Sequence, residues 1–128
     1  QEVMQATSNT SLGGTVKATF ADITSAYAYN AAHDFVDDLG ANDNPNYGSA
    51  VTLGSKTFTN STFDAADTTF TALSGANDLG AIVLYVDSGA EGTSRLVLYL
   101  DTSITGMPFT PSGGDVTIQW NASGIFTL

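Results

Sequence analysis

The sequence has no cysteine, a single histidine, very few basic residues and no long apolar run. Without cysteine the chain can form neither a disulfide nor a thiolate metal site. Three Lys and Arg residues stand against 13 Asp and Glu residues, which gives a net charge of −10 at pH 7. Proteins hold nucleic acids and anionic membranes through Lys and Arg, so we expect neither as a partner. No stretch approaches the roughly 20 apolar residues that span a membrane.

The strongest strand signals lie between Gly80 and Asp101. Residues 81–86 and 95–100 are rich in β-branched, leucine and tyrosine side chains, and a polar loop joins them, which predicts a hairpin. Neither strand alternates apolar with polar residues. A strand that is apolar on both faces has to be covered on both. We therefore expect the hairpin in the middle of a sandwich, or with its second face against another subunit.

Residues 15–20 alternate cleanly, which predicts a half-exposed strand. The expected inward residues are Val16, Ala18 and Phe20, and the expected outward residues are Thr15, Lys17 and Thr19. Residues 31–39 precede Gly40 with the spacing of a short helix or helical turn and the C-terminal glycine that ends one. This segment is the only helix that the sequence predicts.

Further short strands are predicted at 49–53, 55–59, 68–73, 116–120 and 124–128, with turn residues between them. Many short strands with a turn about every ten residues indicate an all-β fold. We expect an antiparallel β-sandwich or jelly-roll-like domain over residues 15–128, with one short helical turn. Residues 1–14 are polar and without period, and we interpret them as an extended N-terminal arm.

The residues that carry chemistry are sparse. His33 stands next to Asp34, and adjacent residues cannot face each other on a helix, so this pair does not form a base with its orienting acid. Oxygen ligands for calcium could come from Asp64 with Asp67, or from Asp37, Asp38 and Asp43. Neither group follows the calcium-loop pattern, and turn capping explains aspartates at such positions. We therefore expect no enzymatic activity, no cofactor and no metal site.

The face of the hairpin that carries Val83, Tyr85, Val97 and Tyr99 has two open interpretations. It is either an interface with another copy or with a partner protein, or it is covered by ordinary burial within the sandwich. Trp120 ends an alternating strand, and we expect it in the core with its indole N–H bonded to a partner near the surface.

Several runs of the sequence resemble a family of small virion proteins of tailed bacteriophages. They are FDAADTTFTALSG at 63–75, YVDSG at 85–89, LYLDT at 98–102 and PSGGDVTIQW at 111–120, in that order and spacing. Residues 20–22 and 29–39 are similar too, so the likeness covers residues 15–128. The resemblance implies a component of a phage particle without an assigned activity.

Two classes of function follow from these observations. The first is a capsid decoration (cement) protein on the outer head surface, which binds and stabilises the major capsid subunits. We expect such a protein to self-associate as a trimer or dimer. Its arm would dock on a neighbouring subunit or on the shell through Val3, Met4 and Leu12.

The second class is a tail or head-fibre component that binds glycans on the host surface. The aromatic platform for a glycan would consist of Tyr27, Tyr29, Tyr47 and Trp120. A hydrolase is a more distant third alternative, because it needs paired carboxylates across a groove and nothing in the sequence favours that arrangement.

Overall fold

The structure is a computed structural model that describes residues 13–22, 28–40, 49–75, 77–102 and 104–128. The described residues form antiparallel β-strands and two short 3-10 helices. The predicted all-β class with one helical turn near residues 31–39 is thereby confirmed. The expected arm, including Val3, Met4 and Leu12, lies almost entirely outside the described residues.

Four strands form the largest sheet, in the order β2-β1-β6-β7, with every neighbouring pair antiparallel. Its strands are β1 (Thr15–Asp22), β2 (Val51–Thr52), β6 (Leu79–Asp87) and β7 (Arg95–Leu100). Two smaller sheets contain β3 (Thr57–Thr59), β4 (Thr62–Asp64) and β9 (Phe126–Thr127), and β5 (Thr68–Phe70) with β8 (Val116–Ile118).

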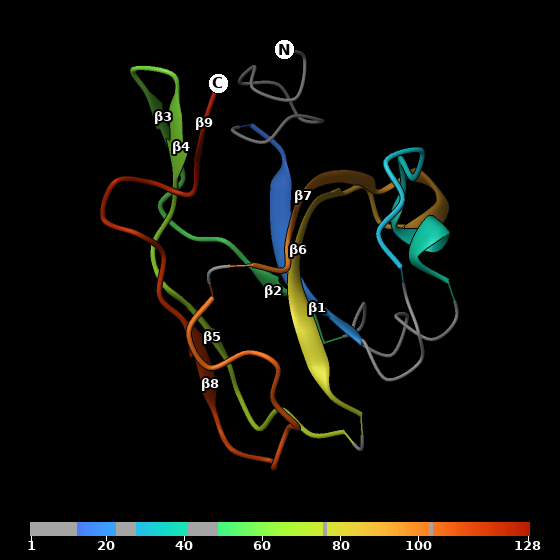
Figure 1. The fold of residues 1–128 in the computed structure, drawn as a ribbon. Coiled ribbons are helices and arrows are strands. Elements are labelled where there is room, and N and C mark those ends of the chain that lie inside the picture. The colour runs from blue at the N-terminus through green and yellow to red at the C-terminus, as the bar shows by residue number, and fades with distance from the viewer. Residues whose placement is uncertain (1–12, 23–27, 41–48, 76, 103) are drawn as a thin grey trace.

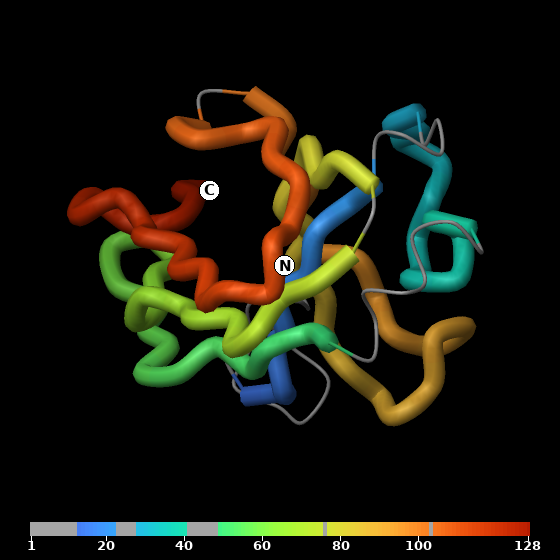
Figure 2. Tube along the Cα trace, turned by 90° about the horizontal axis from the view of Figure 1, so that it is seen from below, coloured from blue at the N-terminus to red at the C-terminus, as the bar shows by residue number. Residues whose placement is uncertain are grey.

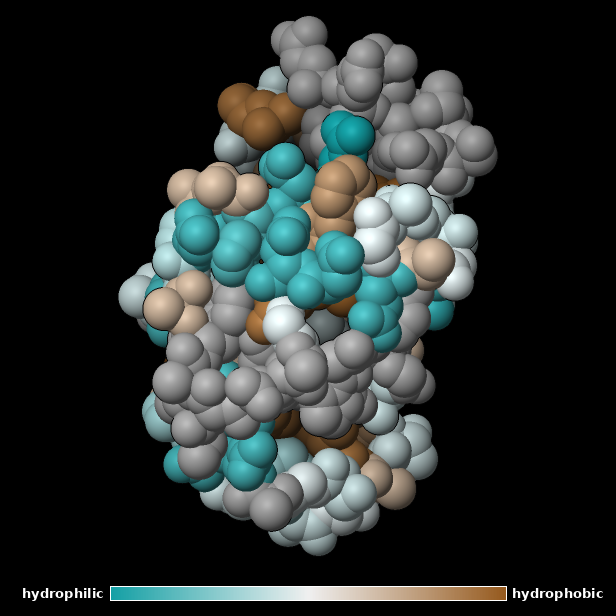
Figure 3. Space-filling view, turned by 90° about the vertical axis from the view of Figure 1, so that its right-hand side faces the viewer, coloured by the Kyte–Doolittle hydropathy of each residue, from teal (hydrophilic) through white to brown (hydrophobic). Residues whose placement is uncertain are grey.

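The elements are arranged in layers around the four-stranded sheet. The two smaller sheets lie on one side of β1 and β6, and residues 28–40 with the β6–β7 loop lie on the other side (Figures 1 and 2). This loop contains the 3-10 helix η4 (Glu91–Thr93), and η2 (Val36–Leu39) belongs to the outer layer. On that outer side the described residues are mostly hydrophilic, with small hydrophobic patches between them (Figure 3).

The main core fills the space between β1, β6 and the smaller sheets. Alternate side chains of the two long strands point into it. They are Val16, Ala18 and Phe20 from β1, with Ile82, Leu84 and Val86 from β6. The Phe20 ring lies 4.7 Å from the Phe70 ring and 5.5 Å from the Phe109 ring, centroid to centroid. The predicted inward face of residues 15–20 is confirmed.

A second, smaller core covers the opposite face of the same two strands. Ala21, Ala81, Val83 and Tyr85 pack there against Val36 and Leu39 of η2. The outward assignment of Thr19 is wrong, because this layer leaves the side chain only 2% exposed. η2 contributes two apolar residues to this face, and the partly buried Ala50, Leu96 and Tyr99 pack against the same cluster.

The glycine that ends η2 was predicted correctly. Gly40 has a φ of 87°, in the left-handed region that favours glycine, and its N–H donates to the Asp37 carbonyl. At the start of the helix the Asp38 carboxylate accepts the backbone N–H groups of Asp34 and Phe35, at 2.9 and 3.0 Å. These bonds satisfy donors that have no partner within the helix.

The hairpin of β6 and β7 is confirmed, but only β6 lies in the interior of the sheet. β7 is at the edge, and each residue from Leu96 to Leu100 is half-buried. The register shifts between Leu84 and Tyr85, so that Tyr99 faces Val83 and Tyr85 faces Leu96. Tyr85 and Tyr99 therefore do not lie opposite each other in the ladder.

Two turns depart from the expected strands. β3 and β4 form a tight hairpin through Asn60 and Ser61, both with positive φ, as in the two-residue turns that suit the twist of a hairpin. The predicted strand 68–73 ends at Phe70, and Ala72 is exposed with a φ of 51°. The chain turns there because the Leu73 N–H donates to the Gly114 carbonyl.

Two of the three basic residues are bound to neighbouring parts of the chain. Lys17 on β1 forms an ion pair with Asp87 at the end of β6, with Nζ and Oδ2 2.6 Å apart. The Lys56 ammonium donates to the Gly14 carbonyl, and partial burial lowers its pKa. Both contacts fasten the start of β1 to the strands around it.

Candidate functional site

Val83 and Tyr85, two of the four expected interface residues, are buried inside the chain. They are 1% and 0% exposed, and the layer with Val36 and Leu39 covers them. A side chain enclosed by its own chain cannot be presented to another protein, so the interface expected at these two positions is wrong. Ordinary burial was the other interpretation of this face, and it holds here.

Val97 and Tyr99 are both half-buried on the edge strand β7, but they do not share the expected face, because Val97 packs against the main core and Tyr99 against the second core. The Tyr99 ring lies 5.3 Å from the ring of Tyr29, which is 62% exposed. A hollow of about 150 Å³ opens beside them, lined by residues 29–31, His33, Leu39, Val83 and residues 96–99. Among the described residues, the outer edge of β7 is bridged at its start, where Arg95 pairs with Phe35 and the Leu96 N–H donates to the Asp34 carbonyl.

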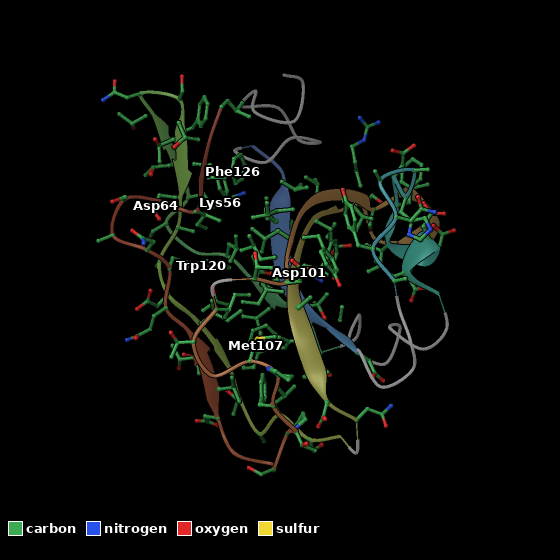
Figure 4. The ribbon with its side chains drawn as sticks, in the orientation of Figure 1. Lys56, Asp64, Asp101, Met107, Trp120 and Phe126 are labelled. Atoms are coloured by element: carbon green, nitrogen blue, oxygen red, sulfur yellow. The ribbon has the colours of Figure 1, made fainter. Side chains whose placement is uncertain are left out.

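A larger cleft of about 700 Å³ lies on the other side of the sheet, between the ends of β6 and β7 and the strand β8. Met107 and Trp120 lie in this space between the central sheet and the layer of β8 (Figure 4). Its apolar lining residues are Phe20, Ile82, Leu100, Ile104, Met107, Phe109, Val116, Ile118, Trp120 and Ile125, and its other lining residues are Thr102, Thr105, Gly106, Thr117, Gln119, Asn121 and Gly124. None of them carries a charge, and the volume is in the range of small-molecule and peptide sites.

The sequence did not predict this cleft, because part of its wall is a loop. Residues 104–109 follow no strand period, yet Ile104, Met107 and Phe109 are apolar and half-buried. Apolar side chains at irregular intervals in a proline- and glycine-containing loop were the available signal. Such residues indicate that the loop packs on another part of the protein, but they do not identify the surface that it covers.

Trp120 is half-buried at the cleft, as expected for a core residue near the surface. Its indole N–H donates to Thr68 Oγ1 at 3.2 Å, which confirms the predicted partner near the surface, and its backbone N–H donates to Asp67 Oδ1 at 3.0 Å. Tyr29 lies in the outer layer on the opposite side of the sheet. These two aromatic residues therefore cannot form one platform for a glycan, and Tyr27 and Tyr47 lie outside the described residues.

Three of the aspartates considered as calcium ligands accept hydrogen bonds from backbone N–H groups. Asp64 accepts the Ala65 N–H, Asp67 accepts the Trp120 N–H, and Asp38 caps η2. No three His, Asp or Glu residues within the described ranges come together as a metal site. Asp43 is not among the described residues.

The capping bonds of Asp38 predict how this carboxyl titrates. Because it accepts the N–H groups of Phe35 and Asp34, its pKa lies below the ordinary value of an aspartate. A lowered pKa in the folded state contributes stability above the unfolded pKa, and the contribution is lost as pH falls through the folded pKa. In an NMR titration, the amide signals of Asp34 and Phe35 should move with a midpoint below that of a free aspartate.

Asp38→Asn should remove this titration, whereas Asp37→Asn, which changes the neighbouring exposed carboxyl, should leave it in place. A midpoint at or above that of a free aspartate in the unsubstituted protein would contradict the assignment.

None of the described helices is long and apolar enough to cross a membrane. Comparison with models of protein families yields no match for this chain, and a search of curated proteins yields none either.

Proposed function

We propose that the protein is a structural component of a phage particle, a capsid decoration protein that binds major capsid subunits on the outer head surface. The sequence resemblance to small virion proteins supports the particle, and the edge strand β7 supports attachment. An all-β domain with an acidic exterior suits a role in which many copies cover a shell. We also propose self-association, as a trimer or dimer, as part of this role.

The exposure of β7 is the observation that carries the proposal. Its sequence RLVLYL is apolar after Arg95, and no residue from Leu96 to Leu100 is fully buried. Soluble proteins usually protect such an edge with charges, proline or a covering segment. Among the described residues, the bridge to Phe35 covers only the start of β7. The outer edge beyond it, with Tyr99 and the neighbouring Tyr29 ring, is left as a surface for another protein.

A fibre component that binds glycans is the alternative, and it has less support. Its platform needed several aromatic residues on one surface, whereas Tyr29 and Trp120 lie on opposite sides of the sheet. Copy number separates the two functions: a decoration protein is present in hundreds of copies per particle, and a fibre component in a handful.

The β7 surface predicts that Tyr99→Asp lowers occupancy on particles. A buried hot-spot residue contributes about 2 kcal/mol or more to binding, which corresponds to a loss of affinity of about 30-fold. The experiment adds purified protein to particles that lack it and counts the bound copies. Thr59→Asp is the matched control, because it adds the same charge at an exposed position of β3.

We expect the Thr59 variant to bind like the unsubstituted protein. Equal occupancy of both variants would exclude β7 as the attachment surface. Only a few bound copies at saturation would instead favour the fibre.

A further inference from the structure

The large cleft borders the edge of β8 rather than one of its faces. Six consecutive residues, 116–121, line it. Successive side chains of a strand point to opposite faces, so a run of consecutive lining residues brings the backbone itself to the cleft. Within the described part of the chain, β8 pairs with a strand on one edge only, and that strand is β5.

The backbone groups of Thr117 and Gln119 point away from β5. In an antiparallel ladder, pairs joined by backbone hydrogen bonds alternate with pairs that lack them and whose side chains are closer. The Thr69 and Thr117 hydroxyls lie 2.9 Å apart, as expected of the second kind. The Trp120 N–H is directed to the β5 side, where it reaches Asp67. Alternation then turns Thr117 and Gln119 toward the cleft.

The walls of the cleft define what can occupy it. They contain no charged residue in a chain of net charge −10, and Leu100, Ile104, Met107 and Phe109 offer apolar surface opposite β8. A free strand edge facing apolar side chains is the arrangement that accepts an extended peptide as an added strand. The segment that enters has to be uncharged, because a buried charge without a partner is costly.

We propose that residues 3–12 of one copy bind as an added strand to the β8 edge of a neighbouring copy. These ten residues, VMQATSNTSL, are uncharged, and they precede the described part of the domain, which begins at Gly13. Fully extended, ten residues span roughly 33 Å, which is enough to reach a second molecule.

Exchange between copies also fits the direction of the chain. The segment leaves β1 at Thr15, whereas Phe20 at the other end of that strand lines the cleft. Two copies that exchange these segments fill both clefts in a closed symmetric pair. The inference concerns contact between copies, and it holds whether or not the protein decorates a capsid.

Complementation between two full-length variants tests the proposal. Met4→Asp puts a charge into the donated segment, and Thr117→Pro removes an N–H from the accepting edge while leaving the ladder to β5 intact. Each variant alone should associate at least tenfold more weakly than the unsubstituted protein in sedimentation velocity. An equimolar mixture should regain dimers, because an intact segment of one variant meets an intact cleft of the other.

Trp120 is the only tryptophan and lines the cleft, so its fluorescence reports occupancy. The Trp120 fluorescence should shift in every sample that forms dimers, and it should stay unshifted in samples that remain monomeric. Thr117→Val is the matched control: it also loses the hydroxyl contact with Thr69 but keeps the backbone N–H, and it should dimerise normally. If Thr117→Pro does not fold, as judged by circular dichroism, Met107→Asp on the opposite wall replaces it.

Three results would overturn the proposal. A monomeric unsubstituted protein in which Met4→Asp still shifts the Trp120 fluorescence means that the segment fills its own cleft. If the mixture of the two variants associates no better than each variant alone, exchange of the segment between copies is excluded. Dimerisation unaffected by either substitution places the contact elsewhere. Failure to bind particles, combined with successful complementation, would refute the decoration function alone.

Discussion

Tyr85→Ala is expected to destabilise the protein by about 3 to 5 kcal/mol, the usual loss when a large buried aromatic side chain is truncated. Tyr85 is fully buried in the second core, where it packs with Ala21, Val36 and Leu39. The loss is a large part of the 5 to 15 kcal/mol of a typical domain, and urea unfolding should show it as a lower midpoint.

Tyr99→Ala is the matched control, because Tyr99 is a tyrosine on the neighbouring strand that is only half-buried. We expect a loss below about 2 kcal/mol for it. Equal losses for the two variants would mean that the second core contributes no more than the strand edge does.

Gly124→Ala is expected to cost about 2 to 4 kcal/mol, from two independent causes. Gly124 has a φ of 101°, which an alanine adopts only with strain. A Cβ at this position would also come within 2.2 Å of Thr62 Cγ2 and 3.2 Å of the Phe63 carbonyl oxygen, so β4 would have to shift. Overpacking of this kind costs about 1 to 3 kcal/mol.

Thr62→Ser separates the two causes. Serine lacks the methyl group that a Cβ would meet, and it keeps the hydroxyl that lies 3.1 Å from Thr127 Oγ1. The double variant should recover the overpacking part of the loss and retain the conformational part. A double-mutant cycle measures this coupling, and strictly additive losses would show that Thr62 does not limit the site.

The sequence predicted the elements whose signals are local. The alternation of residues 15–20, the two apolar arms of the hairpin and the glycine after 31–39 correspond to β1, to β6 with β7, and to η2. β4 was missed because its turn contains Asn60 and Ser61 without the glycine that marks most two-residue hairpins. The strand at 68–73 was extended too far because the contact that bends it, from Leu73 to Gly114, is distant in the sequence.

The candidate sites were harder to predict, since they depend on which segments cover which faces. The pattern of β6 required cover on both faces, and it was equally compatible with a partner chain and with a segment of the same chain. The segment that supplies the cover has only Val36 and Leu39 as buried residues. The edge of β8 could not be predicted for a similar reason. The alternation of residues 116–120 indicates which side chains share a face, but it does not indicate which strands pair with β8.

The contacts of the basic residues have a consequence for crowding. With Lys17 paired to Asp87 and Lys56 bound to the Gly14 carbonyl, Arg95 is the remaining Lys or Arg residue in a chain of net charge −10, so each copy carries a large excess of negative charge. Copies packed side by side then repel one another beyond their contact patches, over a range of about 8 to 10 Å at physiological ionic strength. The salt concentration therefore sets how closely copies can pack in a dense array. A lower ionic strength strengthens the repulsion and separates neighbours, and added salt screens it and lets them approach.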